Sequence, residues 1–303
     1  MAKAQKPKIK HYKFYGFNTT LQSEQRKGDQ AYLELVQNIS KQGVLVPIGA
    51  ERVVMLRNQF KAEYLFNNKV HQILYGKIVR FTVIDPKHWY NTQKRDFENH
   101  ELPAGIFPNG YETDYVFFPS IHRFFVKVDA KITPNIVELF LSEAFEQVIY
   151  QNEEIFVNLM QSTDEINQII NSPRISSLNV SVSYTNEDIG PEYKDFVDGL
   201  LKEAQAGHLD ANFKPDQHGK LANNSKLIRG LLELVKDNGE AQATAEINGK
   251  KKVITTKDYP EKVDIPSESE ESVKIKLLEK MLKENRPEEI IPKKKKKKGG
   301  KKK

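Results

Sequence analysis

The stretch FFPSIHRFFVKVDAKITPN, residues 117–135, places one histidine and one arginine inside an apolar run of aromatic and β-branched residues. Such a run predicts a strand. Thr133 and Pro134 then supply a cap and a first-turn proline for a helix, whose apolar face is spaced from Ile136 to Val148. A strand that leads directly into an apolar-faced helix indicates a layered α and β fold.

The two polar residues of this stretch stand side by side. Side chains alternate between the two faces of a strand, so His122 would lie with Phe124, and Arg123 would lie with Phe125. The pair therefore cannot converge on one reacting atom. We expect His122 to be a hydrogen-bonded histidine among apolar neighbours, and Arg123 to lie on a wetter face, where it is a candidate nucleic-acid contact.

Segments that precede this stretch form the first expected lobe. Residues 9–17 alternate as a strand does, residues 31–40 carry apolar side chains at helical spacing, and the runs 52–58, 61–66 and 69–84 are rich in β-forming residues. These three runs predict an antiparallel meander. The sequence thus predicts an α+β protein with an N-terminal antiparallel lobe that covers residues 1–115.

Segments that follow predict a second lobe over residues 116–258. Strand and helix patterns alternate there, and their order resembles a ferredoxin-like, split βαβ layer in which a helix replaces the central hairpin. Asn248-Gly249 predicts a hairpin turn near its end. Residues 259–303 are expected to form a linker, a helix and a disordered polylysine tail. The apolar stripe of that helix, Val273 to Met281, could dock on its own chain or on a second copy in a homodimer.

Lysines gather at both ends of the chain. Nine lie in PKKKKKKGGKKK, which includes Lys293, Lys294, Lys295 and Lys296, and five more lie among the first thirteen residues. The whole chain carries a formal charge of +6, so residues 14–292 without these fourteen lysines carry −8. Residues 121–220 alone hold eight basic and sixteen acidic residues. Terminal lysines attract polyanions without reading bases, or serve as a solvated tail.

Composition also excludes several classes of protein. The chain has no cysteine, so disulfides and thiolate metal or redox sites are impossible. The basic start lacks the apolar core of a signal peptide, and no stretch of about 18 apolar residues could cross a membrane. We expect a cytoplasmic protein without a membrane partner.

Residues 85–112 lose all periodicity and gather proline, glycine and asparagine, which predicts a long loop. Its single tryptophan, Trp89, stands beside Tyr90, with Lys94 and Arg95 close behind. Aromatic faces that stack on bases, set among cations that meet phosphates, are typical of single-strand binding. Alternatively, Trp89 pins the loop to the core.

No local signature of phosphate-loop, dinucleotide, zinc-protease, serine-hydrolase or kinase chemistry occurs. One weaker pattern is an acidic residue, Asp114, before a strand that ends in Asp129-Ala130-Lys131. Metal-dependent nucleases use such a set, because two carboxylates hold Mg²⁺ or Mn²⁺ while a lysine stabilises the attacked phosphate. Acid-x-Lys triplets are expected by chance in so charged a chain, and the surrounding negative charge opposes a phosphate backbone.

Four segments resemble a family of bacterial proteins of this size that carries only a domain-of-unknown-function label: GKIVRFTVID, WYNTQKR, residues 102–141 and RISSLNVSVSYTNED. The resemblance covers most of residues 70–190 and includes no catalytic signature, so it implies a fold rather than an activity. More distantly, FFVKVDAK, its apolar helix, an EIF strand and SLNVSVSY are similar in layout to RexA, the DNA-binding phage-exclusion protein. That likeness implies a role in phage defence or exclusion.

Three functions follow as hypotheses. The first is a nucleic-acid-binding protein of phage defence or exclusion, without enzymatic activity or a cofactor. The second is the metal-dependent nuclease of Asp114, Asp129 and Lys131. The third is a protein-interaction module whose acidic face, within residues 121–220, binds a basic partner.

Overall fold

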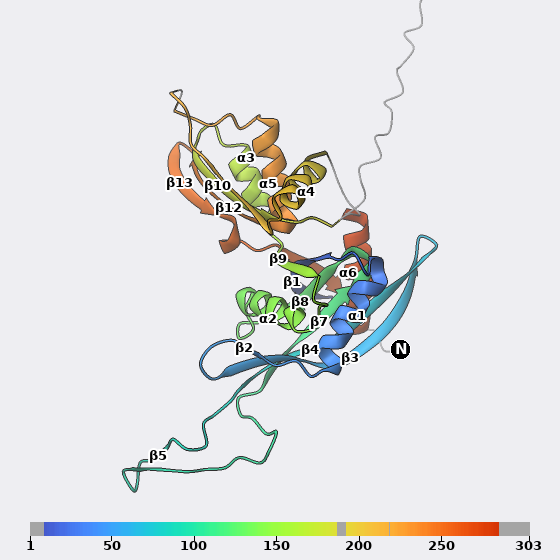
Figure 1. Cartoon of the computed structure of the whole chain (residues 1–303), viewed down its shortest axis with the longest axis vertical. Coiled ribbons are helices and arrows are strands. Elements are labelled where there is room, and N and C mark those ends of the chain that lie inside the picture. Colours follow the sequence, from blue (N-terminus) through green and yellow to red (C-terminus); the bar gives the residue numbers. More distant parts are fainter. Residues whose placement is uncertain (1–8, 187–191, 218, 285–303) are drawn as a thin grey trace, which may run out of the picture.

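The computed structural model describes residues 9–186, 192–217 and 219–284. It contains two antiparallel sheets covered by helices, and a small two-stranded hairpin that projects from the larger sheet (Figure 1). The predicted α+β class is confirmed. We call the two bodies the large-sheet lobe and the small-sheet lobe.

The large sheet has eight strands in the order β14-β1-β8-β7-β4-β3-β2, with β9 also paired to β1. Its strands are β1 (Lys10–Gln22), β2 (Val46–Pro47), β3 (Arg52–Phe66), β4 (Lys69–Thr82), β7 (Tyr111–Phe118), β8 (Arg123–Lys127), β9 (Glu154–Leu159) and β14 (Lys262–Ser267). β1 pairs with β8 along one edge and with β14 and then β9 along the other. Segments from both ends of the described chain therefore close the same sheet.

Helices cover both faces of the large sheet. α1 (Gly28–Lys41) and α2 (Pro134–Glu146) share one apolar core with the strands, and α6 (Glu270–Glu284) packs on a second core that includes Phe14, Val116 and Phe125. A sheet covered on two faces needs apolar side chains at successive positions, which explains the unbroken buried run of residues 115–118.

β8, α2 and β9 form a split βαβ unit. Both strands pair antiparallel to β1 on its opposite edges, so they run parallel to each other with β1 between them. The predicted helix start at Thr133 and Pro134 is confirmed, because Thr133 is the N-cap and Pro134 the first helical residue. Proline fits there because the first-turn N–H has no helical partner.

The stretch 117–131 is not one strand. β7 ends at Phe118, a short 3₁₀ turn η1 (Pro119–Ile121) reverses the chain, and β8 begins at Arg123. His122 caps this turn with a left-handed backbone, φ 56°. Pro119 carries no N–H and cannot continue the ladder, so the expected alternation of faces does not run through His122.

A β-bulge lies where the sequence indicates a break after residue 58. β3 is continuous across this point, but its register against β4 shifts between Arg57 and Phe60. Asn58 takes a left-handed backbone with φ 51°. Gly76 lies opposite on β4, where a Cβ atom would be only 2.5 Å from the Asn58 carbonyl oxygen. The bulge and a residue without a side chain therefore require each other.

The small sheet has the strand order β11-β10-β12-β13. Its strands are β10 (Ile175–Ser183), β11 (His208–Phe213), β12 (Gly239–Ile247) and β13 (Lys250–Thr255), and its helices are α3 (Thr163–Ile170), α4 (Glu192–Ala204) and α5 (Lys226–Asn238). The helices share one apolar core with one face of the sheet. Asn248-Gly249 forms the predicted turn between β12 and β13, with positive φ at both residues.

The division of the chain differs from the expected one. Residue 115 lies inside β7, and one continuous sheet includes β2, β3, β4, β7 and β8, so no lobe ends there. The residues expected to form a ferredoxin-like lobe, 116–258, are divided between two sheets, because β8 and β9 pair with β1 rather than with β10. The expected linker after residue 258 directly follows η2 (Thr256–Asp258) and contains the strand β14, which pairs with β1.

The C-terminal helix α6 docks on its own chain. Its predicted stripe, Val273, Leu277, Leu278 and Met281, is buried against the large sheet. The surface expected to support a homodimer is thus already covered. Within the described ranges, none of the helices has the length and apolar character needed to span a bilayer.

Candidate nucleic-acid interface

An arm projects from the large sheet between β4 and β7. We define the arm as residues 83–110, which extend away from both lobes (Figure 1). Its base is fixed to the sheet: the Thr82 N–H donates to the Pro108 carbonyl at 3.0 Å, and the Phe81 and Phe107 rings stack with centroids 4.9 Å apart. The long loop predicted from composition is therefore an ordered projection anchored at its ends.

The outer half of the arm is a two-stranded hairpin. β5 (Trp89–Asn91) pairs with β6 (Asp96–Glu98), and the tip between them contains Lys94 and Arg95. Asn91 builds the turn, because its side-chain oxygen accepts hydrogen bonds from the N–H groups of Gln93 and Lys94 at 2.9 and 3.0 Å. Arg95 closes it with a left-handed backbone, φ 57°. Such side-chain-closed turns suit asparagine.

Tyr90 and Phe97 form an exposed aromatic pair on this hairpin. They are direct cross-strand partners, and their ring centroids lie 5.4 Å apart at 70°. Their exposed fractions are 55% and 63%, respectively. Two neighbouring rings this open to solvent, on an element with no core beneath them, offer faces on which a planar ligand can stack.

Trp89 neither pins the arm to a core nor lies open like Tyr90. It is half-buried within the arm, where its ring meets the His100 ring edge-on at a centroid distance of 5.5 Å. It also lines a hollow in the arm together with Leu102, Pro103 and Ile106. Both alternatives for Trp89 thus need revision, because its packing stabilises the arm itself.

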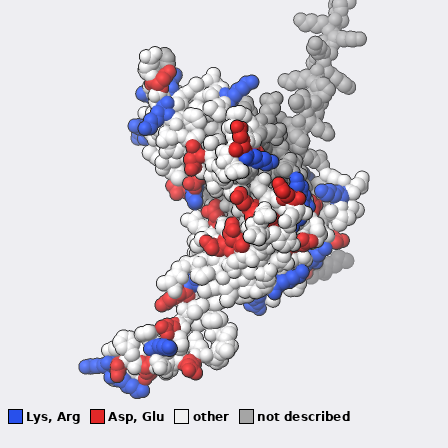
Figure 2. All heavy atoms as spheres, viewed as in Figure 1, with Lys and Arg blue, Asp and Glu red and all other residues white. Residues whose placement is uncertain are grey.

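Charged groups at the hairpin form a small network. Glu98 accepts hydrogen bonds from Lys94 at 2.9 Å, from Asn91 at 3.0 Å, and approaches His100 at 2.7 Å. These bonds, the one from Lys94 above all, lower the pKa of Glu98 to about 2. Figure 2 shows basic side chains at the far tip of the arm and acidic ones across the middle of the molecule. The arm as a whole has three cations and four carboxylates.

Arg123 lies far from this surface, in a buried junction between the two lobes. Its exposed fraction is 4%, and its guanidinium pairs with Asp237 at the end of α5 at 3.0 Å. It also donates to Asn18, whose amide donates in turn to Asn238 at 2.7 Å. The expectation of a wet, nucleic-acid-facing Arg123 is wrong, since the residue holds β1, β8 and α5 together.

His122 belongs to the same junction, as a buried histidine stacked on Tyr32 with ring centroids 3.9 Å apart. Burial, with the neighbouring charge of Arg123, lowers the pKa of His122 to about 4. Its expected burial is confirmed.

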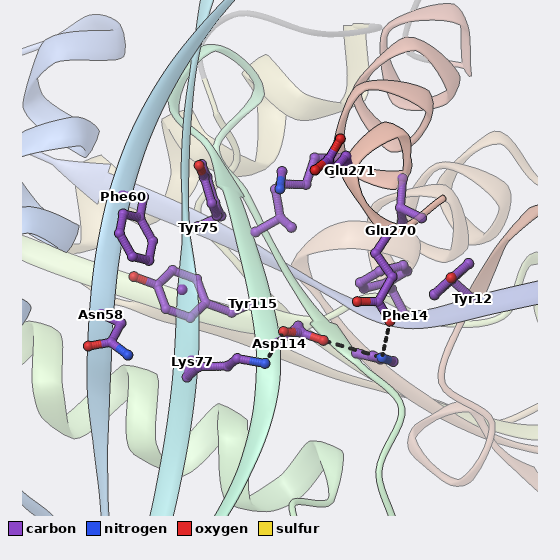
Figure 3. A pocket seen from close by; sticks show the side chains of 15 residues that line it. Tyr12, Phe14, Asn58, Phe60, Tyr75, Lys77, Asp114, Tyr115, Glu270 and Glu271 are labelled. Atoms are coloured by element: carbon purple, nitrogen blue, oxygen red, sulfur yellow. Dashed lines mark hydrogen bonds and ion pairs between the residues drawn. The ribbon is translucent and has the colours of Figure 1, made fainter. Parts of the chain in front are cut away.

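The three residues of the nuclease hypothesis lie in different local structures. Asp114 sits between two lysines, 2.6 Å from Lys77 Nζ and 3.3 Å from Lys127 Nζ (Figure 3). Although burial opposes its ionisation, these lysines hold the pKa of Asp114 below its ordinary value. Asp129 caps a turn by accepting from the Lys131 N–H at 2.7 Å, and Lys131 Nζ lies 3.4 Å from the centroid of the Tyr111 ring.

These residues form ion pairs and a turn rather than a cluster of carboxylates. Across the described part of the chain, no group of three or more histidine or acidic side chains could hold a metal ion. The nuclease hypothesis remains an untested prediction. The four tail lysines, Lys293 to Lys296, lie outside the described residues.

Sequence reasoning missed several residues at these sites. Phe97 follows six polar residues, and only its pairing opposite Tyr90 reveals an aromatic surface. Lys77 and Asp237 become relevant only through partners far away in the chain. The one usable signal was the Asn91 to Arg95 segment, whose turn-forming asparagine could have indicated a hairpin.

Together, the fold and the site define a two-lobed α+β protein with a projecting hairpin arm. The chain belongs to the family described as Domain of unknown function (DUF4747), whose model matches residues 10–283. The expected membership in a domain family of about 300 residues is thus confirmed. No curated protein matches the chain.

Proposed function

We propose that this protein is a non-enzymatic nucleic-acid-binding protein that contacts single strands through its arm. The observation that carries the proposal is the exposed pair of Tyr90 and Phe97 beside Lys94 and Arg95, at the end of an element that stands clear of both lobes. Stacking tolerates any base, because every base has a π-face. Phage defence or exclusion is kept as the proposed setting, on the RexA-like layout alone.

Charge contributes less at the arm than at the chain ends. Lys94 is already engaged by Glu98, and the carboxylates of the arm slightly outnumber its cations. The terminal lysines would therefore supply most of the salt-dependent attraction, while the arm would supply the contacts to bases.

The test is a titration of fluorescent single-stranded DNA and RNA with protein that lacks residues 293–303. Replacing Tyr90 or Phe97 by alanine should each cost about 1–3 kcal/mol of binding. Both rings are more than half exposed, so the melting temperature should not change. Phe196→Ala, which removes an exposed ring from the small-sheet lobe, is the matched control and should bind normally.

Trp89→Ala separates packing from stacking. It should weaken binding by loosening the arm, and it should leave the melting temperature nearly unchanged because Trp89 belongs to no core cluster of either lobe. Unaltered affinity of a Tyr90→Ala/Phe97→Ala double variant would refute a stacking role for the arm.

A second candidate is a protein-binding arm. Leu102, Ile106 and Phe107 are also exposed, and exposed apolar groups of this kind often mark protein contacts. In that case the binding of single-stranded nucleic acid would be insensitive to all arm substitutions. A basic protein held by the arm would also contact the acidic side chains across the middle of the molecule (Figure 2).

A further inference from the structure

A second hollow lies on the large sheet, at the point where α6 begins to cover it (Figure 3). Its volume is about 310 Å³, and its walls come from β1, β3, β4, β7, β8 and the first turns of α6. This size lies at the lower end of the range of small-molecule sites. The hollow is separate from the arm hairpin.

The bulge in β3 shapes this hollow. Asn58 and Gly76 both line it, and a Cβ atom at Gly76 would lie 2.5 Å from the Asn58 carbonyl oxygen and 3.0 Å from the Tyr115 ring. Because residue 76 has no side chain, the bulge and the ring of Tyr115 can both pack closely against it. The backbone irregularity thus lies at the rim of the hollow, where the buried ring of Tyr115 packs against residue 76.

Aromatic rings form one wall. Phe60 and Tyr75 are cross-strand partners with centroids 5.5 Å apart and planes 30° apart. Phe60 is 54% exposed, although it faces the hollow. These rings leave apolar surface uncovered where a planar group could pack.

The charges that line the hollow balance. Its lysines are Lys77, Lys127 and Lys274, and its carboxylates are Asp114, Glu270 and Glu271. Lys77 and Lys127 both pair with Asp114, and Lys274 Nζ lies 4.0 Å from the Tyr75 centroid. An anionic ligand would compete with Asp114 for Lys77 and Lys127, whereas a neutral ligand would leave these pairs in place.

We propose that this hollow binds a nucleobase. A nucleobase is planar, uncharged and of suitable size, and its edge carries both hydrogen-bond donors and acceptors. The amide of Asn58 can both donate and accept, Lys77 can donate, and Asp114 can accept. The proposal rests on the hollow alone and does not need the arm. The base could belong to a free nucleoside or to an unstacked nucleotide of a strand.

The test is calorimetric titration of the full chain with adenosine, guanosine, cytidine and uridine. At least one should bind saturably, and Phe60→Ala should weaken that binding about 5- to 100-fold through the lost stacking. Leu65→Ala is the matched control, because it removes an exposed apolar side chain from the same strand outside the hollow. Melting curves of both variants should match that of the parent protein.

The proposal is overturned if none of the four nucleosides binds saturably, or if Phe60→Ala and Leu65→Ala bind equally well. The source of the base is then read by competition. Displacement of the nucleoside by a single-stranded oligonucleotide, but not by an abasic strand of equal length, identifies a strand as the occupant. Failure of both strands to displace it identifies a free nucleoside, and equal displacement by both would overturn base recognition.

Discussion

Arg123 and Asp237 form a buried ion pair, and we expect the loss of one partner to cost more stability than the loss of the other. Asp237→Asn keeps the shape of the side chain but removes its charge, and it leaves the Arg123 guanidinium almost fully buried without a counter-charge. Arg123→Met instead leaves Asp237, whose side chain is 33% exposed and can be hydrated. The aspartate variant should therefore be the more damaging of the two.

The magnitudes follow from the cost of an uncompensated buried charge. Removing one partner of a buried pair costs about 3–5 kcal/mol, and we assign this range to Asp237→Asn. Arg123→Met should cost less than about 3 kcal/mol, because the remaining charge regains water. The double variant should be more stable than Asp237→Asn alone, because it no longer contains the stranded guanidinium.

Guanidinium chloride unfolding of the four proteins, followed by far-UV circular dichroism, measures these differences. The three values and the wild type complete a double-mutant cycle, in which the coupling between the two side chains should be favourable. If Arg123→Met were the more destabilising variant, or if the two effects simply added, the junction would not depend on this ion pair.

Two further predictions concern pH and salt. Because burial lowers the pKa of His122 from its ordinary value of 6.5 to about 4, the unfolded chain takes up a proton first as the pH falls. The contribution of neutral His122 to the free energy of unfolding is complete above about pH 6.5 and is lost toward pH 4. Between pH 7 and pH 4 the wild type should therefore lose about 3 kcal/mol more stability, measured by denaturant titration, than His122→Asn, in which asparagine tolerates the left-handed backbone. Equal losses in the two proteins would contradict this assignment. Deleting residues 293–303 should weaken strand binding for all sequences and flatten its salt dependence, because nine phosphate-seeking charges are removed, and an unchanged slope would exclude the tail.

Local elements could be predicted from the sequence because their signals are local. The helix after Thr133 follows from a proline, a cap and apolar periodicity, and the turn at Asn248-Gly249 follows from a dipeptide. Pairing between distant segments could not be predicted in this way. β14 is short, contains Pro266 and resembles a linker, yet it is a strand because β1, more than 200 residues earlier, presents a free edge to it.

The site was only partly predictable for the same reason. Composition correctly located an unusual segment around Trp89 and Tyr90, but not which ring faces solvent, because that depends on the pairing of β5 with β6. Arg123 was misplaced because its environment is set by α5, which is 100 residues further along the chain. The charge pattern of a single strand cannot show whether another lobe will cover one of its faces.

β4 and β7 flank the arm, and both strands also line the hollow. β4 contributes Tyr75 and Lys77 to the hollow and continues to Phe81, whose ring stacks on Phe107 at the base of the arm. Tyr75, Lys77 and Phe81 are separated by even numbers of positions along β4, so their side chains lie on one face of the sheet. From Lys77 to Phe81 the strand rises about 14 Å. A single-stranded nucleic acid that stacks on the arm could thus extend along this face toward the hollow. A ligand that binds only at the arm, or only in the hollow, would not use the face that they share.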